Sequence, residues 1–87
     1  MISQEVILES VMHFIGELVP SETPIGPNTD LSQDLGLDSI KLMDLMMKLE
    51  DQFDISIPIN FLMDVRTPKH LADTIVTLME KQKHGAL

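Results

Sequence analysis

Eighty-seven residues allow one small domain with a single modest core. The chain has no cysteine, which excludes disulfides, thiolate zinc sites and a cysteine nucleophile, and with three Phe and no Trp or Tyr its core is expected to be aliphatic and rich in Met. The net charge of −8 argues against binding to nucleic acid or to anionic membrane surfaces, which both require Lys and Arg, and it favours docking on basic patches of partner proteins.

The chain also lacks the patterns that direct a protein to a membrane or out of the cell. No apolar run approaches the about 20 residues of a membrane span, and residues 1–5 lack the basic start and apolar stretch of a signal peptide. We therefore expect a cytoplasmic protein.

The first predicted element is an amphipathic helix over residues 4–19. Ser3 is placed to cap it, and Pro20 is placed to end it. Its apolar positions recur at three- and four-residue steps, and they are Leu8, Val11, Met12, Ile15, Leu18 and Val19.

Residues 20–38 are predicted to form a long loop, because Pro20, Pro24 and Pro27 exclude a regular helix. A connection of this length in a compact domain often has a function or packs on its own. The apolar side chains of Ile25, Leu31 and Leu35 are expected to fix it to the core.

A second helix is predicted over residues 39–53. Asp38 is a good N-cap residue, because its carboxylate can accept hydrogen bonds from N–H groups of the first turn. Ser39 would be the first helical residue, with its hydroxyl at the positive end of the helix dipole, where an attached anion such as a phosphate is favoured. The alternative is purely structural, since Ser and Asp are common at any helix start.

This second helix has two neighbouring apolar stripes. One is assigned to the core, and it consists of Leu42, Leu45, Met46, Leu49 and Phe53. The other consists of Ile40, Met43 and Met47, and it predicts a surface for a partner protein. A wider core is the alternative. The polar side consists of Lys41, Asp44, Glu50 and Asp51.

The rest of the chain predicts two more helices. Residues 54–58 interrupt the helical pattern, with Ile57 expected to fill the core, and residues 60–65 form a short helix. Thr67 and Pro68 are a strong start signal for a last amphipathic helix over residues 68–83. The predicted fold class is all-α, a small bundle with three long helices and one short third helix.

Two kinds of chemistry do not fit the pattern. A serine hydrolase would need a base beside Ser39, but His13, His70 and His84 lie on three different segments, so no catalytic residue is expected. A calcium loop starting at Asp30 would need Gly at its sixth position and Glu at its twelfth. These positions hold Leu35 and Lys41, so no metal site is expected.

The chain resembles the acyl carrier proteins and related thiolation domains over roughly residues 4–80. The resemblance is carried by the segment Asp34-Leu35-Gly36-Leu37-Asp38-Ser39-Ile40, by an E-x-x-F-x-I-x-I-P pattern over residues 50–58, and by Thr67-Pro68. It implies a stand-alone four-helix carrier, acting as a monomer. It also implies that Ser39 is the attachment site of 4′-phosphopantetheine, added by a phosphopantetheinyl transferase, with Asp38 as the helix cap beside it.

The resemblance also implies what the arm carries and which residues bind partner enzymes. The arm's thiol would carry an acyl, aminoacyl or aryl group as a thioester, loaded by an acyl- or amino-acid-activating ligase and used by downstream synthase enzymes. The partner-binding residues would be Ile40, Met43, Asp44, Met47, Glu50 and Asp51, beside Asp38. The bundle near Met46, Phe61 and Leu62 would open to shelter the cargo chain.

Two departures from the family pattern bear on the pathway. Lys41 stands where fatty-acid carriers usually have an acidic residue, and residues 59–64 are much less acidic than in those carriers. Both favour a specialised polyketide, nonribosomal peptide or lipopeptide pathway. The alternatives are a carrier for fatty-acid synthesis and, in another class, a small helical protein-interaction domain without a prosthetic group.

Overall fold

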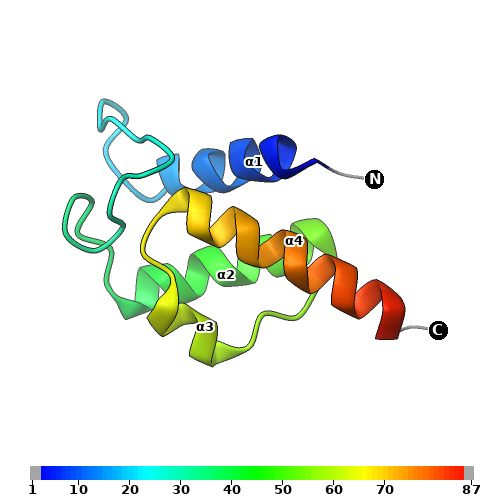
Figure 1. The fold of residues 1–87 in the computed structure, drawn as a ribbon. Helices are drawn as coiled ribbons and strands as arrows, with labels where there is room; N and C mark the ends of the chain where they lie inside the picture. Colours follow the sequence, from blue (N-terminus) through cyan, green and yellow to red (C-terminus); the bar gives the residue numbers. More distant parts are fainter. Residues whose placement is uncertain (1–2, 86–87) are drawn as a thin grey trace.

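The computed structural model describes residues 3–85, and the side chains of all of these except residues 62, 63 and 83–85. In that part of the chain the helices are α1 (Gln4–Gly16), α2 (Ser39–Phe53), α3 (Ile59–Asp64) and α4 (Pro68–Gly85), drawn in Figure 1. The predicted all-α bundle with a short third helix is confirmed. None of these helices has the length and apolar content that a bilayer span requires.

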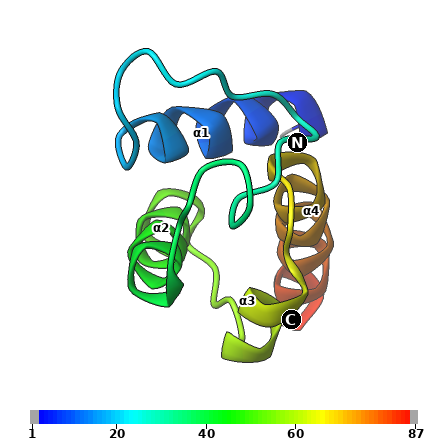
Figure 2. The ribbon, with the colours of Figure 1, turned by 90° about the vertical axis from the view of Figure 1, so that its left-hand side faces the viewer.

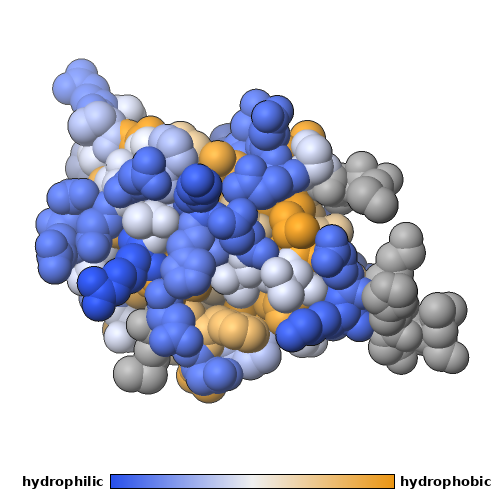
Figure 3. Space-filling model, viewed as in Figure 1, coloured by the Kyte–Doolittle hydropathy of each residue, from blue (hydrophilic) through white to orange (hydrophobic). Residues whose placement is uncertain are grey.

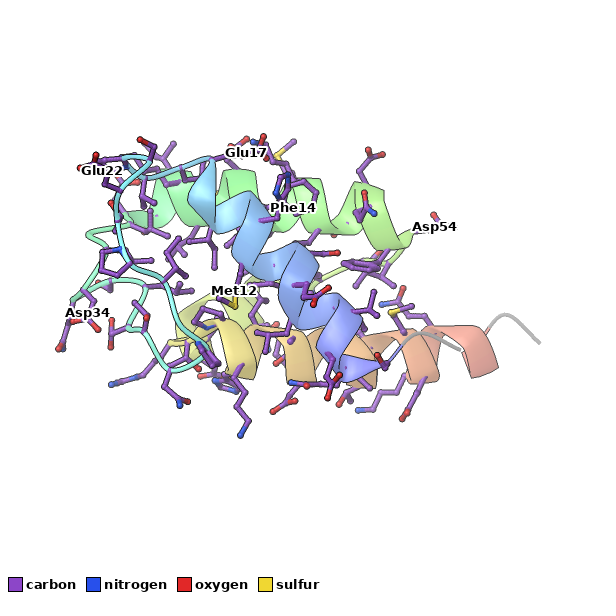
Figure 4. All side chains as sticks on the ribbon, turned by 90° about the horizontal axis from the view of Figure 1, so that it is seen from above. Met12, Phe14, Glu17, Glu22, Asp34 and Asp54 are labelled. Carbon is purple, nitrogen blue, oxygen red and sulfur yellow. The ribbon has the colours of Figure 1, made fainter. Side chains whose placement is uncertain are left out.

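The long helices form two levels. Figure 2 shows α1 lying across the top, with α2 and α4 below it and the short α3 at the bottom. Helix α1 packs mainly on α4 and also on α2, and α3 packs on α2. Seen from above in Figure 4, half-buried Phe14 points from α1 toward the side of α2, and Met12 points toward the side of α4. Successive faces of α1 thus contact both of its neighbours.

The core is built from aliphatic side chains spaced one helical turn apart. On α1 the buried positions are Ile7, Val11 and Ile15, an i, i+4, i+8 stripe that lies on one face of a helix. They meet a buried set from α2 and α4 that comprises Leu45, Met46, Leu49, Leu71, Ala72, Ile75 and Leu78. Among the described residues no polar or charged side chain is buried with them. Apolar packing therefore holds the bundle together.

Helix α1 is shorter than its apolar pattern predicts. It ends at Gly16, not at residue 19, and the N–H groups of Glu17 and Leu18 bond to carbonyls only three residues back. Glycine is a poor helix former, and the tightened turn releases the chain before Pro20. The side chains of Leu18 and Val19 still pack against the core, but from the loop. The connection to α2 therefore begins at Glu17.

This long connection is fixed by two buried leucines and by backbone hydrogen bonds. Leu31 and Leu37 are only 1% and 3% exposed. The N–H of Leu31 donates to the carbonyl of Arg66 at 2.8 Å, and the N–H of Lys69 donates to the carbonyl of Pro27 at 2.9 Å. These bonds join the loop to Arg66, between α3 and α4, and to the first turn of α4, so the loop has a defined place in the fold.

Two acidic side chains of the loop, those of Asp30 and Asp34, accept hydrogen bonds within the loop and stabilise its turn. The carboxylate of Asp30 accepts hydrogen bonds from the N–H groups of Ser32 and Gln33, and the carboxylate of Asp34 accepts one from the N–H of Asp30. Gly36 follows with a φ of 67°, in the left-handed region that favours glycine. No group of three potential metal-ligating side chains occurs among the described residues.

The connection from α2 to α3 differs from its prediction in one respect. Asp54 adopts a left-handed conformation with a φ of 54° and ends α2. The side chain that fills the core is Ile55, 8% exposed, whereas Ile57 is only partly buried. The prediction for Ile57 is confirmed only in part: Ile57 packs against the core, but the sharp turn at Asp54 brings the nearer isoleucine, Ile55, fully inward.

The two later helices also differ slightly from prediction. Helix α3 covers Ile59–Asp64, not residues 60–65, because Val65 is extended and buried. Helix α4 runs to Gly85, two residues beyond the predicted end at 83. The side-chain oxygen of Thr67 accepts a hydrogen bond from the N–H of His70 at 3.1 Å, as a helix cap does.

The loop conformation can be tested with two glycine substitutions. Gly36→Ala should lower the free energy of unfolding by about 1–2 kcal/mol, because an L side chain is strained at positive φ. Gly16→Ala is the control: a Cβ there meets open space, and Ala should raise the stability by up to about 1 kcal/mol. Chemical denaturation of both variants measures this. Equal effects at both positions would contradict the assignment of strain to Gly36.

Candidate functional site

Ser39 is exposed at the first position of α2. The preceding residue, Asp38, is extended, and its carboxylate accepts a hydrogen bond from the N–H of Lys41 at 2.9 Å. Its carbonyl accepts the N–H of Leu42 at 2.9 Å. The predicted cap at Asp38 is therefore present, and it fixes the direction in which α2 leaves the loop.

The turn before α2 explains why Ser39 faces solvent. Leu37 is buried and its N–H donates to the carbonyl of Leu31 at 3.0 Å. With Leu37 held in the core, the next two residues, Asp38 and Ser39, are placed on the surface. Figure 4 shows Asp34 at the outer end of this loop, and Asp54 at the opposite end of α2. The hydroxyl is thus displayed at one extreme of the bundle.

The electrostatics at Ser39 suit an anionic substituent on its oxygen. Among the described residues there is no hydrogen-bond acceptor for the N–H groups of Ser39 and Ile40. Unpaired N–H groups and the dipole at the start of a 15-residue helix stabilise negative charge. An exposed hydroxyl with these neighbours fits a phosphodiester, the linkage through which phosphopantetheine is attached to a serine.

The described histidines lie on other helices. His13 is exposed on α1, where its ring contacts that of Phe14 with a centroid distance of 5.8 Å. His70 is in the first turn of α4, and neither histidine is hydrogen-bonded to Ser39 among the described residues. The side chain of His84 lies outside the described residues.

The second apolar stripe of α2 is exposed. Ile40 is 77% exposed, Met43 46% and Met47 65%, so the alternative that they belong to a wider core is wrong. Ile59, the first residue of α3, adds a fourth apolar side chain that is 72% exposed. Sequence reasoning missed Ile59, although its position directly after Pro58, outside every core stripe, was a signal. We call these four residues the apolar face.

The predicted polar partner residues fall into two groups. Asp44 and Asp51 are exposed, and Asp44 forms an ion pair with Lys48 at 3.7 Å. Glu50 is different: it is only partly exposed, and its carboxylate accepts the N–H of Ile57 at 2.8 Å. The Glu50 carboxylate therefore holds the connection to α3, and its predicted role in partner binding stays a prediction.

A hollow of about 140 Å³ opens between α2 and the start of α3. Its described lining residues are Met43, Met46, Met47, Glu50, Ile57, Pro58 and Ile59. Figure 3 shows a largely hydrophilic face whose apolar surface includes an area at the lower edge, over α3. Met46 was among the residues predicted to shelter a cargo chain. The side chain of Leu62, another of them, lies outside the described residues.

The chain was compared with known families and structures. A family model described as the phosphopantetheine attachment site matches residues 5–75. An acyl carrier protein of Cyanidioschyzon merolae is 31% identical over 75 residues, which cover 85% of this chain and 82% of that protein. An acyl carrier protein of Prochlorococcus marinus is 39% identical over 57 residues, 64% of this chain and 71% of that protein.

A solved structure gives the same result. A Mycobacterium tuberculosis protein assigned as an acyl carrier protein superposes with a TM-score of 0.74 at 30% identity, over 82% of this chain and 96% of that one. Family model, relatives and fold thus agree. The chain belongs to the phosphopantetheine-attachment family of the acyl carrier proteins, which are non-catalytic carriers with covalently attached 4′-phosphopantetheine.

Proposed function

We propose that Ser39 carries the 4′-phosphopantetheine arm, and that the 87 residues act as a single, monomeric carrier domain. The observation that carries the proposal is the exposed Ser39 hydroxyl at the start of α2, directly after the Asp38 cap, within the matched residues 5–75. The attached arm supplies a thiol, which this cysteine-free chain otherwise lacks. Acyl, aminoacyl or aryl groups are held on it as thioesters and presented to partner enzymes.

The residues around Ser39 prepare it for modification by a phosphopantetheinyl transferase. The Ser39 oxygen bonds to the phosphorus of the arm in coenzyme A, its proton leaves, and adenosine 3′,5′-bisphosphate departs. Asp38 keeps the first turn of α2 formed through its bond to the N–H of Lys41. The N–H groups and the dipole at the helix start then stabilise the negative charge of the product diester.

The apolar face is the proposed docking surface for the transferase, for a loading ligase and for downstream synthases. Exposed Met side chains adapt to different partner surfaces because they are unbranched and polarisable. The charges beside them nearly balance, since Lys41 and Lys48 stand against Asp44 and Asp51. Apolar contact at Ile40, Met43, Met47 and Ile59 therefore contributes most of the docking free energy, and Asp44 and Asp51 contribute orientation.

We further propose that the first carbons of the cargo lie in the hollow between α2 and α3. Ser39, Met43 and Met47 are four residues apart, so they lie on one face of α2. Met46 is seven residues after Ser39, about 10 Å along the helix axis at 1.5 Å per residue. An arm folded back along α2 thus brings its thioester to the hollow.

The charges on α2 and α3 indicate which biosynthetic pathway the carrier serves. Lys41 is exposed two residues after Ser39, and Asp64 is the one acidic residue of α3. These features support a specialised polyketide, nonribosomal peptide or lipopeptide pathway, with partners that differ from those of an acidic fatty-acid carrier. Fatty-acid synthesis is the second candidate, because the matched relatives are acyl carrier proteins. A domain without a prosthetic group is not favoured, given the family match.

The attachment site is tested by loading the arm in vitro. Incubation with coenzyme A and a promiscuous phosphopantetheinyl transferase should add one phosphopantetheine mass to the wild-type chain and none to Ser39→Ala. Ser32→Ala, an exposed serine of the preceding loop, is the control and should be loaded fully. Intact-mass spectrometry measures all three. A wild-type chain that gains no mass, or a Ser39→Ala chain that does, would refute the assignment.

The apolar face is tested with the same transferase. Met47→Glu should lower kcat/KM for loading about tenfold, because it replaces an apolar contact worth about 1.5–3 kcal/mol with a charge. Val6→Glu introduces the same charge at an exposed apolar residue of α1, and its loading rate should match the wild type. Equal losses in both variants would mean that added charge, not the face, controls docking.

The orienting role of Asp51 is tested by charge reversal. Asp51→Lys should lower kcat/KM for loading up to about fivefold at low salt, the range for exposed charge pairs, and the difference should vanish near 1 M salt. Glu9→Lys makes the same change on α1, where the side chain is exposed. If both variants lose rate equally, net charge alone explains the effect. Glu50 is not used for the charge reversal, because its carboxylate bonds the N–H of Ile57 and its loss would also change the connection to α3.

A further inference from the structure

One wall of the hollow is the short segment that connects α2 to α3. Ile57, Pro58 and Ile59 face Met46 and Met47 of α2 across it. Helix α3 has only six residues, and Pro58 at its start makes no side-chain cap. The wall therefore depends on contacts with other elements for its position.

A long-range contact ties this wall to α4. The side-chain amide of Gln82 forms two hydrogen bonds with the backbone of one residue, Ser56. Its oxygen accepts the N–H of Ser56 at 3.0 Å, and its nitrogen donates to the carbonyl of Ser56 at 2.7 Å. Two bonds to one peptide residue fix both distance and orientation, as paired strands do in a sheet.

The second anchor comes from α2 itself. The side-chain carboxylate of Glu50 accepts a hydrogen bond from the N–H of Ile57, and the backbone carbonyl of Glu50 accepts one from the N–H of Ile55 at 3.2 Å. Glu50 ties the wall to the helix on the other side of the hollow. Gln82 ties it to α4, whose buried residues belong to the core. Both anchors oppose movement of the wall away from α2.

The hollow is small and partly open to solvent. Its volume of about 140 Å³ is below the about 300–1,000 Å³ of sites that bury drug-sized ligands. A short acyl group fits, while a longer chain requires the wall to move away from α2. Each additional buried methylene favours that movement, and the two bonds of Gln82 oppose it.

We infer that Gln82 is a positioning residue that limits the length of the acyl chain sheltered on this carrier, by holding Ser56 and thereby the wall of the hollow. The inference rests on the proposed function at Ser39. It predicts that loss of the Gln82 amide extends shelter to longer chains and leaves the short-chain thioester unchanged. Gln82 lies on α4, outside the proposed docking surface, so its substitution leaves the docking residues of α2 unchanged.

The experiment compares two cargo lengths on the full chain. Wild type, Gln82→Ala and Gln4→Ala are loaded by a promiscuous transferase from acetyl- and octanoyl-coenzyme A, and thioester cleavage by hydroxylamine is followed by intact mass. Gln4→Ala is the matched control, because Gln4 also makes an exposed long-range hydrogen bond, to Asp73 on α4 at 3.1 Å. The ratio of octanoyl to acetyl cleavage rates cancels general effects on stability.

We expect this ratio to fall about threefold or more in Gln82→Ala, the effect of removing one or two neutral hydrogen bonds, and to stay at the wild-type value in Gln4→Ala. Gln82→Glu keeps an acceptor for the N–H of Ser56 but loses the donor, so its ratio should lie between. Hydrogen exchange at Ser56 and Ile57 should quicken in Gln82→Ala.

Two failures are distinguishable. If the wild-type chain accepts no arm, the proposed function at Ser39 falls and the inference falls with it. If loading succeeds but the ratio is the same in wild type and Gln82→Ala, or shifts equally in Gln4→Ala, the inference about Gln82 is wrong and the carrier function stands.

Discussion

The burial of Leu31 and Leu37 is the constraint on which the functional end of this protein depends. The chain between α1 and α2 has no regular structure, yet α2 begins where it does because these two leucines are in the core. The bond from the N–H of Leu31 to the carbonyl of Arg66 holds the same loop to the start of α4. Gly36 supplies the reversal between the leucines, and Asp38 then caps the helix. The exposed hydroxyl of Ser39 is thus positioned by two buried leucines.

Helix α2 divides its circumference among three tasks. Leu45 and Leu49 face the core, Glu50 holds the connection to α3, and the apolar face remains exposed. A carrier needs this division because the same helix must stay folded while it contacts several enzymes in turn. Because the buried side chains lie on one side of α2 and the exposed apolar side chains on another, contacts on the exposed side leave the core packing intact.

The acidic charge of the chain is not concentrated on this helix. Of the net charge of −8, α2 accounts for only one unit, since two Lys offset most of its three acidic residues. Five negative charges and no Lys or Arg lie on the connection between α1 and α2, and α1 adds Glu5 and Glu9, whereas α4 carries a net charge of +1. The negative charge is therefore concentrated on α1 and on the connection that leads to Ser39, while the exposed surface of α2 is apolar and mixed in charge.

The sequence by itself determined the features that depend on neighbouring residues. The all-helical class, the cap at Asp38, the exposed position of Ser39 and the start of α4 at Pro68 all follow from local spacing, capping chemistry and the rigid ring of proline. Tertiary structure alone decided what depends on residues distant in the chain. Ile7 was missed beside Leu8, and Ile55 took the place predicted for Ile57, because periodicity cannot rank adjacent apolar residues before their neighbours in space are known. The backbone hydrogen bonds of Glu50 and Gln82 could not be predicted from the sequence, because a polar side chain that bonds a backbone seven or 26 residues away is recognisable only after the fold brings the two together.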